Sequence, residues 1–397
     1  MKVLIFSTAY FPHVGGAEVA VKEITDRLTS GSTAGGAVEP LNFDMVTVRL
    51  NKKDLPQEKI SNINIYRIGW GVGRIDKLLF PFLAARFADK LHQQNKYNIV
   101  WSIMASYSGF AALFFKKKNP EVKFLLTLQE GDDLAQIEKK VWLVKKWFKE
   151  IFTKADYIQC ISSYLAEWAK KMSAQGRSAS GGGASCVIEV VPNGTNLQFS
   201  ISNDHSISND QFLNSKVILT TSRLVKKNGI KDLIKAFSIL NIKYSILNIQ
   251  LIICGDGEEQ NKLQKLAKDL NIADKVKFVG FVEPKELPKY YAISDVFCRP
   301  SLSEGLGNSF LEAMAYEIPV VATPVGGIPD FLEDGKTGWF CKVKNPESIA
   351  EKIKYILDPK SKDEVERVVK NAKKLVEEKY NWDKIAVQMK NIFNKLK

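Results

Sequence analysis

The sequence predicts an α/β protein with two doubly wound domains in tandem, and three observations support this fold class. Short runs rich in β-branched residues alternate with helical patterns through the first half of the chain. The same alternation then restarts and continues to the end. The length of 397 residues suits two domains of about 150 to 200 residues better than one core. Strands that alternate with helices are typical of a parallel sheet with crossover helices.

The strand-like runs set out the expected sheets. In the first half they span residues 3–6, 45–48, 63–68, 99–103, 124–128, 157–161 and 187–191. In the second half they span residues 217–221, 251–254, 276–279, 296–298, 320–322 and 339–341. Helical patterns lie between them, for example at residues 17–28, 139–152, 230–240 and 260–270.

The join between the domains is expected in the polar stretch at residues 203–214. The first domain would then span residues 1–202 and the second residues 203–379. The amphipathic pattern of residues 380–397 predicts a final helix. Two segments rich in Gly, Ser and Ala are expected to be inserted loops, residues 29–37 and 177–185.

Composition and charge narrow the class of protein. Lys and Arg number 57 against 44 Asp and Glu, so the net charge is +13. Such an excess attracts nucleic acid, anionic lipid or phosphorylated ligands, and it also fits a basic surface kept for solubility. The five cysteines form no CxxC pair and are expected to be reduced thiols. With three histidines in the chain, a histidine metal site is not expected.

Neither a leader nor a membrane span is expected. The apolar run at residues 3–6 has only strand length, and His13 and Glu18 follow it quickly. The uncharged window at residues 97–115 is long enough to span a membrane. Serine and glycine interrupt it, so we expect a strand, a turn and the start of a helix there instead.

A glycine-bearing loop at residues 300–315 carries the strongest chemical signal. It follows a strand that ends at Arg299 and leads into an apolar helix, whose N-terminus suits a phosphate. Glu312 lies among apolar helix residues, where a carboxylate needs donors such as ligand hydroxyls. Glu304 stands at the loop entrance and could accept hydrogen bonds from a sugar. The alternative is that Glu312 complements the helix dipole and Glu304 is a solvated acid.

Two glutamates separated by seven residues in PSLSEGLGNSFLEAMA resemble the signature of the retaining glycosyltransferases conventionally numbered family four, the glycosyl transferases group 1. The resemblance covers nearly the whole chain, because further motifs follow in the family's order. They are Gly15-Gly16-Ala17-Glu18, Val191-Pro192-Asn193-Gly194, Ser222-Arg223-Leu224, Gly255-Asp256-Gly257, Pro319-Val320-Val321-Ala322-Thr323 and Gly326-Gly327.

The resemblance implies a GT-B fold, in which two Rossmann-like domains face each other across a cleft. It places the nucleotide-sugar donor on the second domain and the acceptor on the first, with helix 380–397 packing back on the first domain. We expect Glu304, Arg223, Lys227 and Asp132 to be catalytic. The donor-binding residues would be Gly16, Arg223, Lys227, Phe281, Glu304, Gly305, Leu306, Gly307, Asn308 and Glu312. The acceptor or sugar would be positioned by Gly15, Gly16, Gln129, Glu130 and Asp132.

Three positions depart from the family pattern. The family's lysine before the glycine of RLxxxKG is replaced by Asn228, so Lys227 is our candidate for the diphosphate. Gln129 stands where the family often has a histidine, and glutamine cannot take a proton. Asp132 is therefore our candidate to assist the acceptor, although the acids of this loop could instead cap the following helix. Asp330 replaces a glutamate that is usual after the Gly-Gly turn.

The basic stretch at residues 139–149 carries tryptophan and lysine together, which suggests an interfacial membrane contact. In the alternative interpretation, Leu143, Trp147 and Ile151 form a core-facing stripe and the lysines a solvated back.

The sequence therefore predicts a retaining glycosyltransferase in cell-surface polysaccharide or glycoconjugate synthesis. Its partners would be a nucleotide-sugar donor, a glycan or lipid-linked acceptor and, as a further candidate, an anionic membrane surface. We expect no metal, no cofactor and no nucleic acid. The expected location is cytoplasmic or peripheral on the inner face of the membrane. A nucleotide-sugar epimerase and an inactive carbohydrate-binding protein of the same fold remain alternatives.

Overall fold

The structure is a computed structural model that describes residues 1–29, 41–174, 186–196, 215–244, 246 and 248–397. It divides into two compact units. One consists of residues 1–193 and 382–397, and the other of residues 194–381. The expected join at residues 203–214 lies outside the described residues, as do residues 30–37 and 177–185 of the expected loops.

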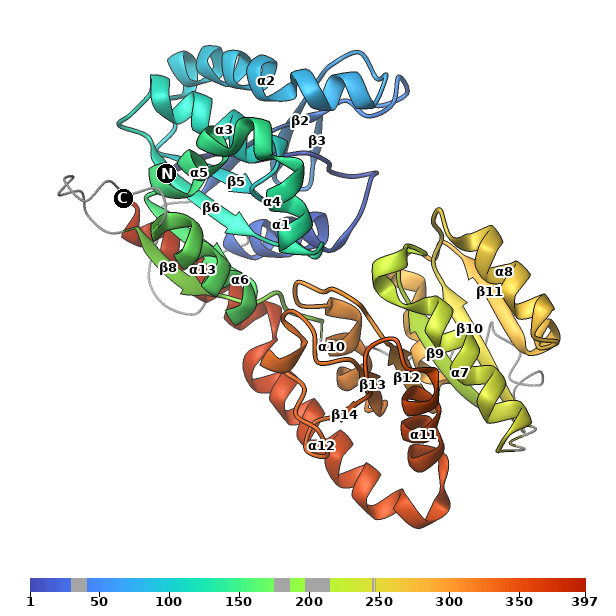
Figure 1. Cartoon of the computed structure of the whole chain (residues 1–397). Helices are drawn as coiled ribbons and strands as arrows, with labels where there is room; N and C mark the ends of the chain where they lie inside the picture. Colours follow the sequence, from blue (N-terminus) through green and yellow to red (C-terminus); the bar gives the residue numbers. More distant parts are fainter. Residues whose placement is uncertain (30–40, 175–185, 197–214, 245, 247) are drawn as a thin grey trace. The chain divides into compact units, whose positions relative to one another are not determined.

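The first unit is an α/β domain with one eight-stranded sheet (Figure 1). Its strands are β1 (Lys2–Ser7), β2 (Asn42–Val48), β3 (Gln57–Ile60), β4 (Ile63–Ile68), β5 (Ile99–Ile103), β6 (Lys123–Leu128), β7 (Tyr157–Cys160) and β8 (Val187–Val190). Its helices are α1 (Gly16–Thr29), α2 (Arg74–Asn95), α3 (Tyr107–Lys118), α4 (Leu134–Lys140), the 3-10 turn η1 (Trp142–Val144), α5 (Lys145–Lys154), α6 (Ser163–Ala174) and α13 (Trp382–Lys395).

The strand order of this sheet is β3-β4-β2-β1-β5-β6-β7-β8. All neighbours are parallel except β3 and β4, and the edge strand β3 was not among the predicted strands. Chain order reverses beside β1, which has β2 on one side and β5 on the other. Open α/β sheets bind ligands at the carboxyl ends of their strands at such a switch point.

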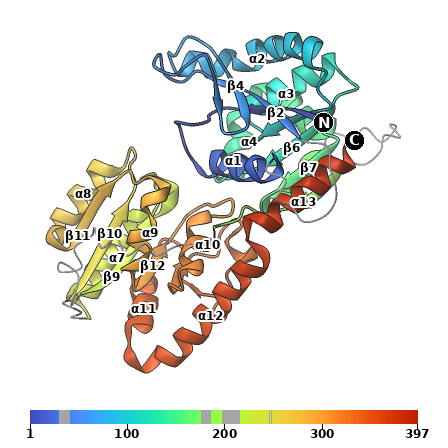
Figure 2. The same ribbon diagram turned by 180° about the vertical axis from the view of Figure 1, so that it is seen from behind.

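Alternate side chains of β1 pack on opposite faces of the sheet. Val3 and Ile5 join the core beneath α1 and α13, while Phe6 meets Phe115 of α3 on the other face. The terminal helix α13 is part of this core, because Phe393 packs edge-on against Trp101 with ring centroids 5.3 Å apart. Figure 2 shows α13, in red, alongside the strands of this unit.

The second unit contains a six-stranded parallel sheet. Its strands are β9 (Lys216–Thr221), β10 (Ile249–Cys254), β11 (Val276–Gly280), β12 (Val296–Arg299), β13 (Val320–Ala322) and β14 (Trp339–Phe340). Its helices are α7 (Ile230–Ile242), α8 (Gln260–Asp269), α9 (Pro288–Ala292), α10 (Asn308–Ala315), α11 (Pro346–Leu357) and α12 (Lys362–Lys379). The 3-10 turns among its described residues are η3 (Lys226–Asn228), η4 (Ala273–Lys275), η5 (Pro284–Glu286), η6 (Ile328–Asp330) and η7 (Pro359–Ser361).

The strand order of the second sheet is β11-β10-β9-β12-β13-β14. Chain order reverses between β9 and β12, so this sheet has its own switch point. Its main core lies between the sheet and helices α7, α8 and α11. Two sheets of mainly parallel strands, both covered by helices, confirm the α/β fold class.

The prediction of one continuous helix at residues 139–152 is wrong. The pattern at residues 139–152 forms three pieces, α4, η1 and α5, with an interruption at Val141. The window at residues 97–115 forms β5, a turn and α3, as expected. Among the described residues, no helix is both long and apolar enough to cross a membrane.

Candidate functional site

The candidate site of the second unit lies at the carboxyl ends of β9, β10 and β12, where three loops interlock. Gly229 has a φ of 70°, and a Cβ there would come within 1.9 Å of the carbonyl oxygen of Pro300. The amide of Leu302 donates to the carbonyl of Lys227 over 2.6 Å. A Cβ on Gly255 would lie 1.8 Å from the carbonyl oxygen of Ser222. The loops are therefore in contact only because glycine occupies both positions.

Glu304 is held by a buried arginine that the sequence analysis did not include. Arg299 Nη2 lies 2.6 Å from Glu304 Oε2, and both side chains are largely buried. Arg299 also donates to Ser309 Oγ over 2.8 Å and lies over the Phe310 ring. Its position as the last residue of β12, directly before the glycine loop, was the one available signal. The amide of Gly305 donates to Glu304 Oε1 over 3.1 Å.

The Gly-Gly turn after β13 fixes the backbone of Glu304. Gly326 has a φ of 59°, and a Cβ there would lie 1.7 Å from the carbonyl oxygen of Glu304. The amide of Gly327 donates to that carbonyl over 3.2 Å. Asp330 follows at the end of η6. The turn therefore supports the loop that carries the glutamate.

Glu312 lies in α10 and has a protein partner that the sequence analysis missed. Tyr291 Oη donates to Glu312 Oε2 over 2.7 Å, and Tyr291 is fully buried. Burial raises the pKa of Glu312, while the Tyr291 hydrogen bond and the Arg299 charge oppose that rise. We expected a ligand to donate to this carboxylate, and a tyrosine supplies one donor instead. Part of Glu312 remains exposed, so it can also face a ligand. No spacing marked Tyr291 as its partner.

The backbone at the start of α10 adds potential donors. Gly307 has a φ of 93°, and a Cβ there would meet the Phe310 ring at 2.6 Å and Arg299 Nη2 at 2.9 Å. Asn308 is the first residue of α10, so Gly305, Leu306, Gly307 and Asn308 form the approach to a helix N-terminus. Such an end carries unpaired N–H groups and suits an anion.

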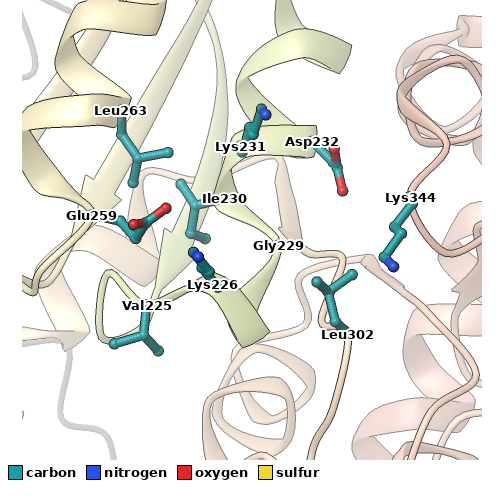
Figure 3. A pocket seen from close by; sticks show the side chains of 10 residues that line it. All are labelled: Val225, Lys226, Gly229, Ile230, Lys231, Asp232, Glu259, Leu263, Leu302 and Lys344. Carbon is teal, nitrogen blue, oxygen red and sulfur yellow. The ribbon is translucent and has the colours of Figure 1, made fainter.

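The loop after β9 carries Arg223 and Lys227, the two cations expected at the diphosphate, and also Lys226. Asn228 is buried, and its side chain donates to the carbonyl of Arg223 over 2.7 Å. This hydrogen bond closes the loop, so Asn228 has a structural role there. Arg223 is exposed and Lys227 half-buried. Lys226, together with Lys231 and other residues, lines a pocket of about 340 Å³ at the start of α7 (Figure 3).

Phe281 follows β11 and is 61% exposed. Gly280, which precedes it, has a φ of 84°, and its carbonyl accepts from the amide of Gly255 over 2.7 Å. This contact ties the β11 end to the β10 turn. An exposed aromatic ring at the edge of the site is suited to stacking on a planar group.

In the first unit, the predicted residues lie after β1 and β6. Gly15 precedes α1 and Gly16 is its first residue. Gln129 is buried, and its Oε1 accepts from Asn193 Nδ2 over 3.2 Å. Glu130 Oε1 accepts from the amide of Ala105 over 2.6 Å.

Burial raises the pKa of Glu130 to about 7. Its Oε2 has no hydrogen-bond partner among the described residues. Asp132 is exposed, and the cap of α4 is its neighbour Asp133, whose Oδ1 accepts from the amide of Ala135 over 2.9 Å. The N-cap of α4 is therefore Asp133.

The structure gathers no group of three or more His, Cys, Asp or Glu side chains suited to a metal ion within its described ranges. The five cysteines are free, and four of them are buried.

Residues 203–375 match the family of glycosyl transferases group 1. An uncharacterized glycosyltransferase of Methanocaldococcus jannaschii is 38% identical over 178 residues, which cover 45% of this chain and 44% of that protein. A second uncharacterized glycosyltransferase of that organism is 26% identical over 422 residues, which cover 100% of this chain and 99% of that protein. A GDP-mannose-dependent mannosyltransferase of Mycobacterium tuberculosis is 31% identical over 43% of this chain and 46% of that protein. Apart from the second relative, these proteins are matched over less than half of their length.

Solved structures share the fold of the whole chain. Sucrose-phosphate synthase from Thermosynechococcus elongatus aligns over 100% of this chain and 98% of that chain, with a TM-score of 0.82 and 20% identity. Anabaena HepE in complex with UDP-glucose aligns over 100% of both chains, with a TM-score of 0.77 and 16% identity. These comparisons confirm the GT-B fold and the resemblance to glycosyl transferases group 1.

Proposed function

We propose that this protein, whose residues 203–375 match the glycosyl transferases group 1, transfers a sugar from a nucleotide-sugar donor to a glycan or lipid-linked acceptor with retention of configuration. The observation that carries this proposal is the pair of glutamates around α10, with Glu304 in the loop before the helix held by Arg299 and Glu312 within the helix held by Tyr291. The pathway would be cell-surface polysaccharide or glycoconjugate synthesis.

The donor would lie across the loops of the second unit. The carboxylate of Glu304 would accept hydrogen bonds from the sugar, and its ion pair with Arg299 fixes its direction. Glu312, which is half-buried and accepts from Tyr291 through Oε2, would also accept from the ribose. Phe281 would stack on the base.

The leaving group would be a nucleoside diphosphate, whose negative charge grows as the anomeric bond breaks. Arg223, a lysine of the β9 loop and the amides before α10 would stabilise that charge. Because these groups could neutralise the diphosphate, we propose a reaction that does not depend on a metal ion. The resemblance implies attack on the same face of the sugar that the diphosphate leaves, without a covalent enzyme intermediate.

The acceptor would bind to the first unit near Gly15, Gly16, Gln129, Glu130 and Asp132. We propose a cytoplasmic location, peripheral on the inner face of the membrane where the acceptor is lipid-linked. The net charge of +13 supports contact with an anionic surface.

A panel of UDP-, GDP- and ADP-sugars tests the proposal, because the relatives and neighbours include both a GDP-mannose-dependent enzyme and a UDP-glucose complex. The expected result is release of free nucleoside diphosphate from one donor class, through hydrolysis or transfer. An isomerised nucleotide-sugar without diphosphate release would indicate an epimerase. Nucleotide-dependent thermal stabilisation without any turnover would indicate an inactive binding protein.

A further inference from the structure

An exposed apolar surface lies on the first unit, along the loop before α2 and the first turns of that helix. Six of its apolar side chains are 40% to 62% exposed, namely Trp70, Val72, Ile75, Leu78, Leu79 and Phe82. Single exposed apolar residues are common, but a group of this size usually marks an interaction site. The amphipathic stretch at residues 139–149, the candidate contact in the sequence, does not include any of them.

The loop that presents Trp70 and Val72 is fastened to the helix. Asp76 is buried, and its carboxylate accepts from the amides of Trp70, Val72 and Gly73 over 2.7, 2.6 and 3.1 Å. The two apolar side chains are therefore held outward by a built turn. The buried carboxylate of Asp76 thus fixes a turn that exposes two apolar side chains to water. Such a fixed, exposed apolar surface favours a binding partner that covers it.

The stretch at residues 139–149 extends the same surface. Trp142, Leu143 and Trp147 are 69%, 77% and 44% exposed, so the core-facing alternative for Leu143 and Trp147 is wrong. Aromatic rings join them to α2. Phe82 stacks on Phe114 of α3 at 5.1 Å, and Phe114 meets Trp147 edge-on at 6.1 Å. We call the exposed apolar residues of 70–82 and 142–147 the apolar platform.

Lysines flank the second part of the platform in the sequence. Residues 139–149 contain five lysines and no acid. Within the described parts of the chain, none of these five lysines forms an ion pair. Their charge is therefore available to an external anion.

We propose that the apolar platform docks on an anionic lipid bilayer, with its tryptophan rings at the headgroup level and its lysines on the lipid phosphates. Tryptophan and lysine beside exposed Leu, Ile and Phe form the pattern that such an interface accommodates. This contact goes beyond the proposed transfer reaction, and it brings the first unit to the surface where a lipid-linked acceptor would lie.

Charge argues against the other occupants. A second copy joined through the same surface would set five lysines against five lysines, and like charges would repel. A nucleic acid would satisfy the lysines but would leave aliphatic side chains such as Ile75 and Leu78 against its phosphates. An anionic bilayer satisfies both parts of the surface.

Vesicle co-sedimentation of the full chain tests the proposal. The vesicles are phosphatidylcholine alone, and equal parts of phosphatidylcholine and phosphatidylglycerol, at low and high salt. We expect binding to the mixed vesicles that weakens with salt, because surface charges are screened within about 8 Å at physiological ionic strength. Leu78→Ser/Phe82→Ser and Trp142→Ser/Leu143→Ser should each weaken binding by about tenfold or more.

Two controls lie in the second unit. Ile242 is 66% exposed, so Ile242→Ser removes a matched apolar group without touching the platform. Lys265→Glu/Lys268→Glu on α8 matches the charge change of Lys145→Glu/Lys146→Glu. Only the changes in the first unit should reduce vesicle binding. Stabilisation by nucleoside diphosphate should stay unchanged in every variant, so loss of docking is distinguishable from failure of the proposed transferase function.

Three results would overturn the docking proposal. The first is the absence of any preference for anionic vesicles. The second is full binding by Leu78→Ser/Phe82→Ser when Lys145→Glu/Lys146→Glu abolishes it, since charge alone would then suffice. The third is a wild-type dimer that Leu78→Ser/Phe82→Ser converts to a monomer, because the platform would then be an interface between copies.

Discussion

Glu304 and Glu312 have different partners, and their replacements should therefore differ. Glu304→Ala removes the group proposed to hold the sugar, so turnover should fall by about a hundredfold or more while nucleoside diphosphate affinity stays near wild type. Glu312→Ala should weaken diphosphate binding by about tenfold, or about 1.4 kcal/mol. Titration calorimetry and diphosphate release measure the two effects. Glu333→Ala is a surface control. Normal affinity and turnover in both site variants would refute the assignment.

Replacing Lys226 and Lys227 one at a time would show which of these lysines contacts the diphosphate. The family pattern led to Lys227, whereas Lys226 lines the pocket beside α7. If Lys227 neutralises the leaving group, Lys227→Ala should lower turnover by about tenfold or more, because the charge grows in the transition state. Lys226→Ala should then have a small effect. The reverse order would assign the role to Lys226.

Two adjacent aspartates separate catalysis from helix capping. Asp132 is exposed, while Asp133 accepts from the amide of Ala135 and caps α4. If Asp132 assists the acceptor, Asp132→Asn should reduce transfer by about a hundredfold and leave donor hydrolysis and melting temperature unchanged. Asp133→Asn should change neither property much, since asparagine is also a good cap. Normal transfer by Asp132→Asn would leave the proton acceptor to another group.

Glu130 should make the stability of the first unit depend on pH. Burial raises the pKa of Glu130 in the folded protein to about 7 from its usual value of 4.5, so the folded state holds the proton more tightly. The stabilisation from this group is complete below the unfolded pKa and is lost as pH rises through about 7. Glu130→Gln should remove this dependence, and denaturant titrations at several pH values would show it. If wild type and Glu130→Gln lost the same stability as pH rises, the pH dependence would come from other groups.

At the scale of elements, the sequence predicts the structure best where hydrophobic periodicity and glycine positions give strong signals. The loop from Pro300 to Asn308 and the Gly326-Gly327 turn were recognisable because both need glycine conformations. Arg299 and Tyr291 were missed because their roles depend on contacts between β12, α9 and α10, which no spacing along one segment reveals. The helix expected at residues 139–152 breaks at Val141, so Leu143 turns outward instead of joining the core.

The Gly326-Gly327 turn provides a test at this scale. Gly326→Ala places a Cβ against the Glu304 carbonyl and also requires a left-handed residue, whereas Gly335→Ala has a φ of 72° but nothing within 4 Å. Gly335→Ala measures the backbone strain alone, about 1 kcal/mol. Gly326→Ala should lose more stability and most of its turnover, measured by thermal melting and diphosphate release. Equal effects of the two changes would show that the turn does not support Glu304.

At the scale of the whole molecule, the chain crosses between its units twice, and the terminal helix α13 completes the core of the first unit. Phe393 is fully buried against Trp101, while Val387 of the same helix is 43% exposed. Phe393→Ala should therefore destabilise the first unit by about 3–5 kcal/mol, and Val387→Ala should have little effect.

Differential scanning calorimetry with and without nucleoside diphosphate can assign this loss to one unit. A ligand at about 100 times its dissociation constant adds about 2.7 kcal/mol to the unit that binds it. The proposed donor site lies mainly on the second unit, so diphosphate should mainly raise one transition and Phe393→Ala should lower another. The second unit has its own core around α7, α8 and α11, so it can remain folded when the first is weakened. A single transition that responds equally to the ligand and to Phe393→Ala would mean that the units unfold together, and that α13 stabilises the donor domain as well.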